Sequence, residues 1–178
     1  MAPNISRKPS RRTGILRKLG AACAVAALSF TGIGLSAVPS QAYSTSFDLF
    51  SVSTHIQGKG WITGPGTKSQ GLRLEAIKVV QNKSDRICLR AHVSNVGWQG
   101  TKCTTGKGTS ITVGTTGRSL AIEAVETWIP TRGLTVTAHI KNIGDQRVTR
   151  STKGGHVTVG TTGRALQMEW FYIQPHAL

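Results

Sequence analysis

The chain has 178 residues and carries 22 lysines and arginines against 7 acidic residues, which gives a formal net charge of +15. This length suits a single domain and excludes a large multidomain enzyme. Three cysteines are too few for a disulfide-dense miniprotein, and a hydrophobic content of 38% is enough for a packed core, so wholesale disorder is excluded as well.

The first 42 residues have the layout of a secretory signal peptide. Six basic residues and no acid precede an alanine-rich apolar stretch, and small residues at Ser40 and Ala42 stand where signal peptidase reads the chain. A membrane anchor is the weaker alternative, because Gly, Ser and Thr dilute the apolar character of residues 21–38. We therefore expect cleavage between Ala42 and Tyr43, which gives a secreted, extracellular protein with no membrane attachment after processing.

The expected mature chain, residues 43–178, keeps two cysteines and a net charge of +9, since the leader removes six basic residues and no acid. An even number of cysteines in an oxidising compartment predicts a disulfide between Cys88 and Cys103. A zinc or catalytic role for this pair is disfavoured, because no further ligands stand at the usual spacing. We expect no metal and no cofactor.

Three segments of the mature chain alternate apolar and polar residues with a period of two, which predicts half-buried strands over residues 50–56, 87–93 and 134–140. A second apolar frame with an internal glutamate predicts another strand after each of them. These frames are Leu72–Ile77, Leu120–Val125 and Leu166–Phe171. Clusters of Gly and Thr are expected to form the turns. No segment of the mature chain shows a sustained helical period, so we predict an all-β fold.

The same arrangement occurs three times. Thr112–Arg118 recurs unchanged as Thr158–Arg164, and a weaker copy begins at Gly66. Each first strand contains a histidine, and each histidine is followed at the fifth position by glycine. The residues just after that glycine are Trp61, Trp98 and Asp145. The repeats cover about residues 47–81, 86–129 and 133–174.

One repeat of this length is too small to bury its own apolar face. Three repeats can bury theirs together around a pseudo-threefold axis, which also removes exposed sheet edges. We therefore predict a single domain over residues 43–178 with a β-prism-like arrangement. A β-trefoil is the alternative architecture for three units of this size.

The second repeat shows the whole motif. It has His-x-x-x-x-Gly-Trp at 92–98, Gly-Thr-x-Gly at 114–117 and a hydrophobic frame with Glu-Ala at 122–124. This pattern resembles the clostridial hydrophobic-Trp (ChW) repeat family. The resemblance implies a secreted bacterial protein with a binding role at the cell surface, toward carbohydrate or protein. Two departures are Asp145 in place of the signature Trp, and Ser69 in place of the second glycine.

Five residues are candidates for ligand binding: Trp61, Trp98, His55, His92 and His139. A Trp after the glycine is either an exposed platform for a sugar ring or a filler of the junction between repeats, and both interpretations stay open. A binding site formed on these tryptophans would be missing from the third repeat, where Asp145 replaces the ring. Trp128 and Trp170 stand at other positions and are interpreted as packing.

The repeated histidines and glutamates have a simpler explanation than catalysis. Convergence of the three histidines on one metal is disfavoured, because Arg90 lies next to His92 in the strand pattern. Each repeated glutamate is expected to accept hydrogen bonds from a turn or from the histidine of its own repeat. No local catalytic signature is present, so we do not expect an enzyme.

The sequence therefore predicts a non-enzymatic binding protein that recognises a carbohydrate or an anionic cell-wall polymer in grooves between repeats, with a protein as a further candidate partner. The net positive charge attracts anionic polymers. Scattered basic residues and few aromatics argue against specific nucleic-acid recognition. A secreted hydrolase, an enzyme inhibitor and a structural surface protein are the alternatives. The oligomeric state stays open.

Overall fold

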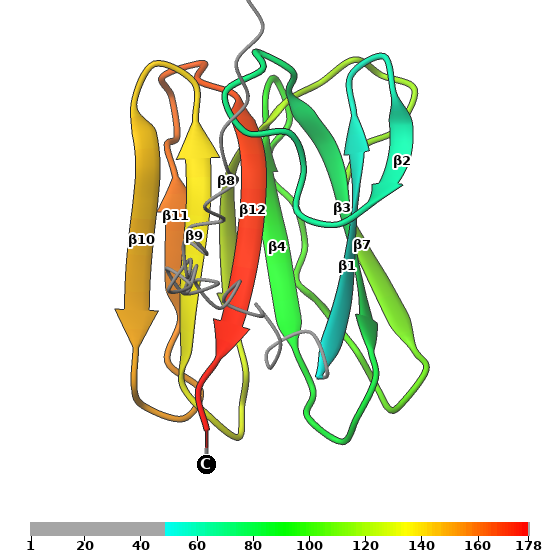
Figure 1. The fold of residues 1–178 in the computed structure, drawn as a ribbon, viewed down its shortest axis with the longest axis vertical. Coiled ribbons are helices and arrows are strands. Elements are labelled where there is room, and N and C mark those ends of the chain that lie inside the picture. The colour runs from blue at the N-terminus through cyan, green and yellow to red at the C-terminus, as the bar shows by residue number, and fades with distance from the viewer. Residues whose placement is uncertain (1–48, 178) are drawn as a thin grey trace, which may run out of the picture. The chain divides into compact units, whose positions relative to one another are not determined.

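The computed structural model describes residues 49–177, and every regular element in this range is a β-strand (Figure 1). The predicted all-β class is confirmed. The expected signal peptide and its cleavage position at Ala42 and Tyr43 lie outside the described residues and stay predictions. Within the described range, no helix has the length and apolar character needed to cross a membrane.

The strands form three antiparallel sheets, two of which stand out at the left and the right of Figure 1. The first sheet has the order β2 (Gly60–Thr63), β1 (Phe50–Ile56), β3 (Leu74–Gln81) and β7 (Ser110–Gly114). The second has the order β10 (Gly144–Arg150), β9 (Leu134–Ile140) and β12 (Met168–Pro175). The third has the order β11 (Val157–Gly160), β8 (Ile122–Trp128), β4 (Cys88–Val93) and β5 (Gly97–Trp98), with β6 (Lys102–Cys103) also paired to β4.

The two predicted strands of each repeat are present. The alternating segments form β1, β4 and β9, and the glutamate frames form β3, β8 and β12. The prediction that the Gly-Thr segments are turns was wrong in part, since β7 and β11 end on the glycines Gly114 and Gly160 and only the residues after them turn. Their partners lie in other repeats, and local composition does not reveal such partners.

The Gly-Thr segments link the repeats in a closed cycle. Strand β7 of the second repeat pairs with β3 of the first, and β11 of the third pairs with β8 of the second. Gly66 of the first repeat closes the cycle through an antiparallel bridge to Trp170 of the third. At each crossing a threonine amide donates to a glutamate carbonyl: Thr115 to Glu75 at 2.7 Å, Thr161 to Glu123 at 2.9 Å and Thr67 to Glu169 at 3.1 Å. This cycle is compatible with the predicted pseudo-threefold arrangement, and the choice between β-prism and β-trefoil stays a prediction.

Each crossing requires a glycine. The φ values of the three glycines are +116° for Gly66, +92° for Gly114 and +102° for Gly160. Residues that carry a side chain rarely adopt this backbone conformation. A Cβ atom at these three positions would lie only 2.6, 2.4 and 2.2 Å from the same glutamate carbonyl oxygens. The glycine of the Gly-Thr motif is therefore the residue that lets two repeats come into backbone contact.

The apolar residues of all three repeats meet in one buried cluster. The inward positions of the first strands, among them Ile56, Leu89 and Ile140, are fully buried. The disulfide joins Cys88 on β4 to Cys103 on β6, with a Cα–Cα distance of 4.0 Å. This confirms the pairing predicted from the cysteine count. The polar faces of the first strands point away from the core and carry the histidines.

Candidate ligand-binding sites

A tight hairpin follows the first strand of each repeat and explains the motif spacing. The amides of Lys59, Val96 and Ile143 each donate to the carbonyl of the strand's last residue at 3.0 Å. The hairpin then places the sixth residue after the histidine directly opposite it. The resulting cross-strand pairs are His55 with Trp61, His92 with Trp98 and His139 with Asp145.

In the first two repeats a glutamate from the next strand holds the histidine. Nδ1 of His55 lies 3.0 Å from Oε2 of Glu75, and Nδ1 of His92 lies 3.0 Å from Oε2 of Glu123. The first contact is a hydrogen bond. In the second the two atoms are equally close, but they are not aligned for a hydrogen bond. Both glutamates are buried. The expectation that a glutamate forms a hydrogen bond with the histidine of its own repeat is confirmed for the first repeat.

The ring of each of these histidines lies nearly perpendicular to the ring of its tryptophan. The ring centres of His55 and Trp61 are 5.4 Å apart with an interplanar angle of 79°, and those of His92 and Trp98 have the same distance and the same angle. Two sites that lie in different sheets therefore have the same geometry. Edge-to-face contacts of this kind fix the orientation of a ring that would otherwise rotate.

A cation also lies over each of the two tryptophans. Nζ of Lys78 on β3 is 4.8 Å from the ring centre of Trp61, and the guanidinium carbon of Arg90 on β4 is 4.8 Å from that of Trp98. The two repeats therefore have the same type of cation–π contact, although the cation comes from a different strand in each. Arg90 is in addition paired with Glu126.

Trp61 and Trp98 lie on the surface, with 42% and 38% of their area exposed. This exposure disagrees with a fully buried role for either ring at a junction between repeats. Exposure is what a platform for a ligand requires, and ligand binding itself stays a prediction. Trp128 is half-buried and stacks on His156 with ring centres 3.9 Å apart, which agrees with its predicted packing role.

The third repeat has a different polar cluster. Nδ1 of His139 lies 2.7 Å from Oδ1 of Asp145, so the aspartate replaces Glu169 as the partner of the histidine. The other carboxylate oxygen of Asp145 accepts from Lys68, and Nε2 of His139 lies 3.2 Å from Oγ of Ser69. Lys68 and Ser69 belong to the first repeat. The cluster therefore bridges the first and third repeats.

An aromatic ring is present in the third repeat, but on the opposite side of the histidine. Trp170 on β12 pairs with His139, at the place where Ala76 and Ala124 pair with the other two histidines. Trp170 is half-buried and stacks with Tyr172 at a centroid distance of 5.6 Å and an interplanar angle of 27°. The interpretation of Trp170 as a packing residue is incomplete, because its ring also lines a surface pocket.

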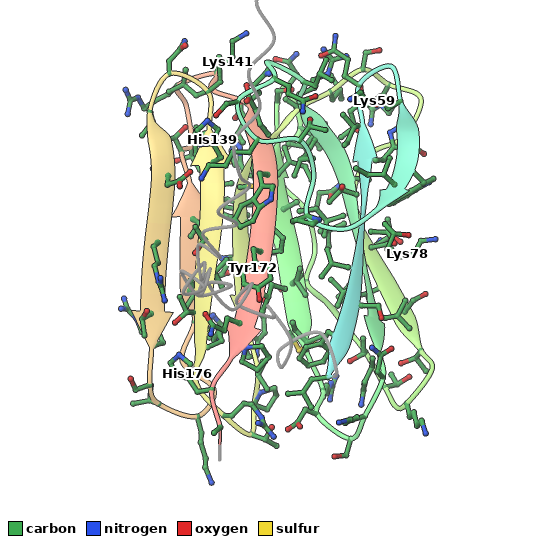
Figure 2. The ribbon with its side chains drawn as sticks, viewed as in Figure 1. Lys59, Lys78, His139, Lys141, Tyr172 and His176 are labelled. Atoms are coloured by element: carbon green, nitrogen blue, oxygen red, sulfur yellow. A yellow bond between two sulfur atoms is a disulfide. The ribbon has the colours of Figure 1, made fainter. Side chains whose placement is uncertain are left out.

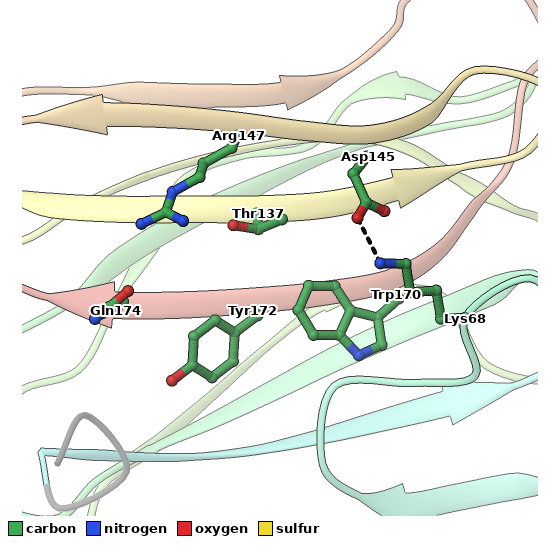
Figure 3. A pocket seen from close by; sticks show the side chains of 7 residues that line it. All are labelled: Lys68, Thr137, Asp145, Arg147, Trp170, Tyr172 and Gln174. Carbon is green, nitrogen blue, oxygen red and sulfur yellow. Dashed lines mark hydrogen bonds and ion pairs between the residues drawn. The ribbon is translucent and has the colours of Figure 1, made fainter. Parts of the chain in front are cut away.

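This pocket lies on the outer face of the sheet β10-β9-β12 and has a volume of ≈ 340 Å³ (Figure 3). It is lined by Lys68, Thr137, Asp145, Arg147, Trp170, Tyr172 and Gln174. The strand register explains the composition, since Arg147 pairs with Thr137 and Thr137 pairs with Tyr172 in one row across the sheet. Figure 2 places Tyr172 and His139 on the neighbouring strands β12 and β9.

Two contacts hold the pKa of the Asp145 carboxyl below its usual range. The larger effect is the hydrogen bond from Lys68, and the hydrogen bond from His139 acts in the same direction. Slight desolvation opposes both. The carboxylate is therefore retained in mildly acidic solution, and with it the link between the first and third repeats.

Sequence reasoning singled out only Asp145 among the residues of this pocket and missed the other six: Lys68, Thr137, Arg147, Trp170, Tyr172 and Gln174. The period of two places residues 170, 172 and 174 on one face of a strand, and this signal was available. The position of Lys68 was not available, because it depends on contact between the first and third repeats. Among the described residues, no group of three or more His, Cys, Asp or Glu is placed to hold a metal ion.

Comparison with known proteins gives one match. Residues 92–129 match the family model described as ChW, Clostridial hydrophobic W. The segment begins at His92 and contains Trp98 and Glu123, so it includes the site of the second repeat. The resemblance inferred from the sequence is confirmed for this segment. No curated protein and no solved structure matches the chain.

Proposed function

We propose that the protein is a secreted, non-enzymatic binding protein of the bacterial cell surface or extracellular space, and that it recognises carbohydrate at Trp61 and Trp98. The ChW match over residues 92–129 supports a bacterial extracellular repeat protein. The choice of carbohydrate comes from the chemistry of the two tryptophan sites. Secretion follows from the expected signal peptide in residues 1–42.

The observation that carries the proposal is that two exposed tryptophans have the same kind of support. Each indole makes a T-shaped contact with a histidine and has a cation over its ring. An apolar side chain fixed in place on the surface loses little conformational entropy when a ligand arrives. The flat indole offers an apolar surface for the C–H face of a sugar ring, and the neighbouring polar groups offer hydrogen bonds to its hydroxyls.

The surface charge adds a long-range attraction toward anionic polymers. Figure 2 shows basic side chains on the surface, including Lys78 on β3 and Lys59 and Lys141 in the hairpin turns. Such a charge raises the rate of encounter with an anionic polymer and weakens as salt is added. It does not select one polymer. Selection therefore depends on the tryptophan sites.

A glycan array with the mature chain, residues 43–178, identifies the ligand class, and calorimetric titration then measures affinity. We expect Trp61→Ala and Trp98→Ala each to weaken binding at their own site by about 5- to 150-fold, taking base–aromatic stacking as the guide. Ile143→Ala is the matched control, because this apolar side chain is exposed to a similar extent, 39%, on the equivalent hairpin of the third repeat.

The double variant Trp61→Ala/Trp98→Ala decides the question. If it binds the array ligands as tightly as the wild type while its circular dichroism is unchanged, carbohydrate recognition by these residues is ruled out. Shortened oligosaccharides after incubation with the wild-type protein would instead support the alternative of a secreted hydrolase.

A further inference from the structure

The pocket of the third repeat contains an unpaired cation. Arg147 is exposed on β10 and has no hydrogen-bond or ion-pair partner within residues 49–177. Lys68, the other cation of the pocket, is already neutralised by Asp145. The pocket therefore carries a net positive charge at its Arg147 end, and Figure 3 shows that this end lies away from the Lys68–Asp145 pair.

An aromatic floor lies across the sheet from this arginine. Trp170, which is half-buried, and Tyr172, which is buried, are alternate residues of β12, and their rings are near-parallel with centres 5.6 Å apart. Arg147 and Tyr172 belong to the same row of the sheet with only Thr137 between them. Because neighbouring strands are about 4.8 Å apart, the backbones of Arg147 and Tyr172 are separated by roughly 10 Å. The small side chain of Thr137 leaves the space between them open.

The first two repeats do not provide this combination. Their cations, Lys78 and Arg90, lie over the tryptophan rings themselves, and Arg90 also pairs with Glu126. In the third repeat Arg147 is free to meet an anion. Lys68 lies 5.8 Å from the ring centre of Trp170 and is held there by Asp145. The third site thus differs from the other two in charge as well as in the strand that supplies its aromatic ring.

We propose that this pocket binds an acidic sugar, a pyranose that carries a carboxylate. The sugar ring lies on Trp170 beside Tyr172, its carboxylate pairs with Arg147, and Thr137 and Gln174 are placed for hydrogen bonds to its hydroxyls. A guanidinium recognises a carboxylate through two parallel hydrogen bonds, and this geometry favours an anion at the edge of a ring. The pocket volume of ≈ 340 Å³ is within the usual range for small-ligand sites. This inference does not depend on ligand binding at Trp61 or Trp98.

The test compares two trisaccharides that differ only at C6, where one carries carboxylates and the other hydroxymethyl groups. The mature chain, labelled with ¹⁵N, is titrated with β-1,4-linked triglucuronate and with cellotriose, and binding is followed at the Trp170 indole N–H. We expect the acidic trisaccharide to bind at least tenfold more tightly than the neutral one. Arg147→Gln should weaken triglucuronate by about 10- to 100-fold, the range for a lost hydrogen bond to a charged group.

Arg150→Gln is the matched control, because Arg150 is also exposed on β10 and the change removes the same charge. It should leave the preference for the acidic sugar intact. The Trp61→Ala/Trp98→Ala variant should also retain it, and that result separates this site from the proposed function.

Four results would overturn the inference: equal affinity for the two trisaccharides, equal weakening by the two arginine variants, shifts confined to Trp61 and Trp98, or tighter binding of triglycerol phosphate than of triglucuronate. The last result would assign the pocket to a phosphate polymer.

Discussion

Trp170 lies directly across from His139, at the position that alanine occupies opposite the histidines of the other two repeats. The third repeat has therefore lost the hairpin tryptophan and carries an aromatic ring on the other neighbour of its central strand. The carboxylate of Asp145 has taken over the contact with His139. The repeats thus place an aromatic ring beside the histidine either on the hairpin strand or on the strand at the other side. The charged groups around the ring differ between these two arrangements.

The glycine at each crossing between repeats is expected to be essential for stability. Gly114→Ala forces a Cβ to within 2.4 Å of the Glu75 carbonyl oxygen at a φ of +92°. The strained backbone alone costs about 1–3 kcal/mol, and separation of β7 from β3 adds to this cost. Urea denaturation should show a loss of at least about 2 kcal/mol in the free energy of unfolding.

Gly117→Ala is the control for this substitution. Gly117 also has a positive φ, +70°, but no atom lies within 4 Å of the Cβ that alanine would add. We expect a loss of only about 1 kcal/mol, from the backbone conformation alone. Equal losses for the two variants would show that the close approach of the repeats does not contribute.

The structure shows which parts of the fold were predictable from a single sequence. Strands β1, β4 and β9 were predictable because alternate residues such as Leu89 and Ala91 face the core while Arg90 and His92 do not. The short strands β2 and β5 were not predicted, because two to four residues contain too little of a pattern. Strand β7 was taken for a turn, because its partner lies in another repeat and only the folded chain brings them together.

Removal of the disulfide should reduce stability and leave ligand binding unchanged. Cys88 and Cys103 are separated by 15 residues, and closing a loop of this length stabilises the folded state by roughly 3 kcal/mol in the chain-entropy model. The variant Cys88→Ser/Cys103→Ser should lose about this amount in urea denaturation. Reduction of the wild-type protein is the control and should give a similar loss. Identical denaturation curves with and without reductant would contradict the prediction.

The carboxyl of Asp145 should titrate below the range of an ordinary aspartate, because Lys68 and His139 both stabilise its charged form. A lowered pKa in the folded state means that the contact adds stability above the ordinary pKa and loses it as the pH falls through the folded pKa. Since the side chain is exposed, the effect on stability is small. Carbon-detected NMR titration measures the pKa directly.

Lys68→Met is the variant that tests the cause. It removes the largest contribution and should raise the pKa of Asp145 toward its ordinary value. Lys141→Met, a change of the same charge at an exposed position next to the core residue Ile140, should leave that pKa where it is in the wild type. If the pKa of Asp145 rose equally in both variants, the overall charge of the protein, and not the contact with Lys68, would determine that pKa.

Export should remove the first 42 residues. Protein secreted by a bacterial expression host should begin at Tyr43 when it is analysed by N-terminal sequencing. Ala42→Phe places a large residue where the peptidase requires a small one and should block cleavage at this position. Thr45→Phe, a change just past the expected cleavage position, is the control and should be processed normally. Secreted wild-type protein that retains the leader would contradict the prediction.

The candidate sites show the limit of sequence reasoning in a second way. The spacing of His92 and Trp98 was visible, and a hairpin turns this separation of six residues into a cross-strand pair. Whether the ring is exposed was left open, because burial depends on what the next repeat places over it. Lys68 came from outside the third repeat, and no local pattern connects it to Asp145.

The exposed tryptophans should contribute little to stability, and this separates a surface role from a core role. Trp61 and Trp98 keep 42% and 38% of their area in solvent, and each alanine variant loses an edge-to-face contact and a cation–π contact. These contacts are worth about 0.5–1.5 kcal/mol each at exposed sites. Trp61→Ala and Trp98→Ala should therefore each lower the free energy of unfolding by about 1–2 kcal/mol in urea denaturation. Phe171→Ala, a change at a fully buried ring, is the reference and should cost about 3–5 kcal/mol. Losses at Trp61 or Trp98 as large as the loss at Phe171 would assign these residues to the packing of the fold, and the platform would then have to be sought at Trp170.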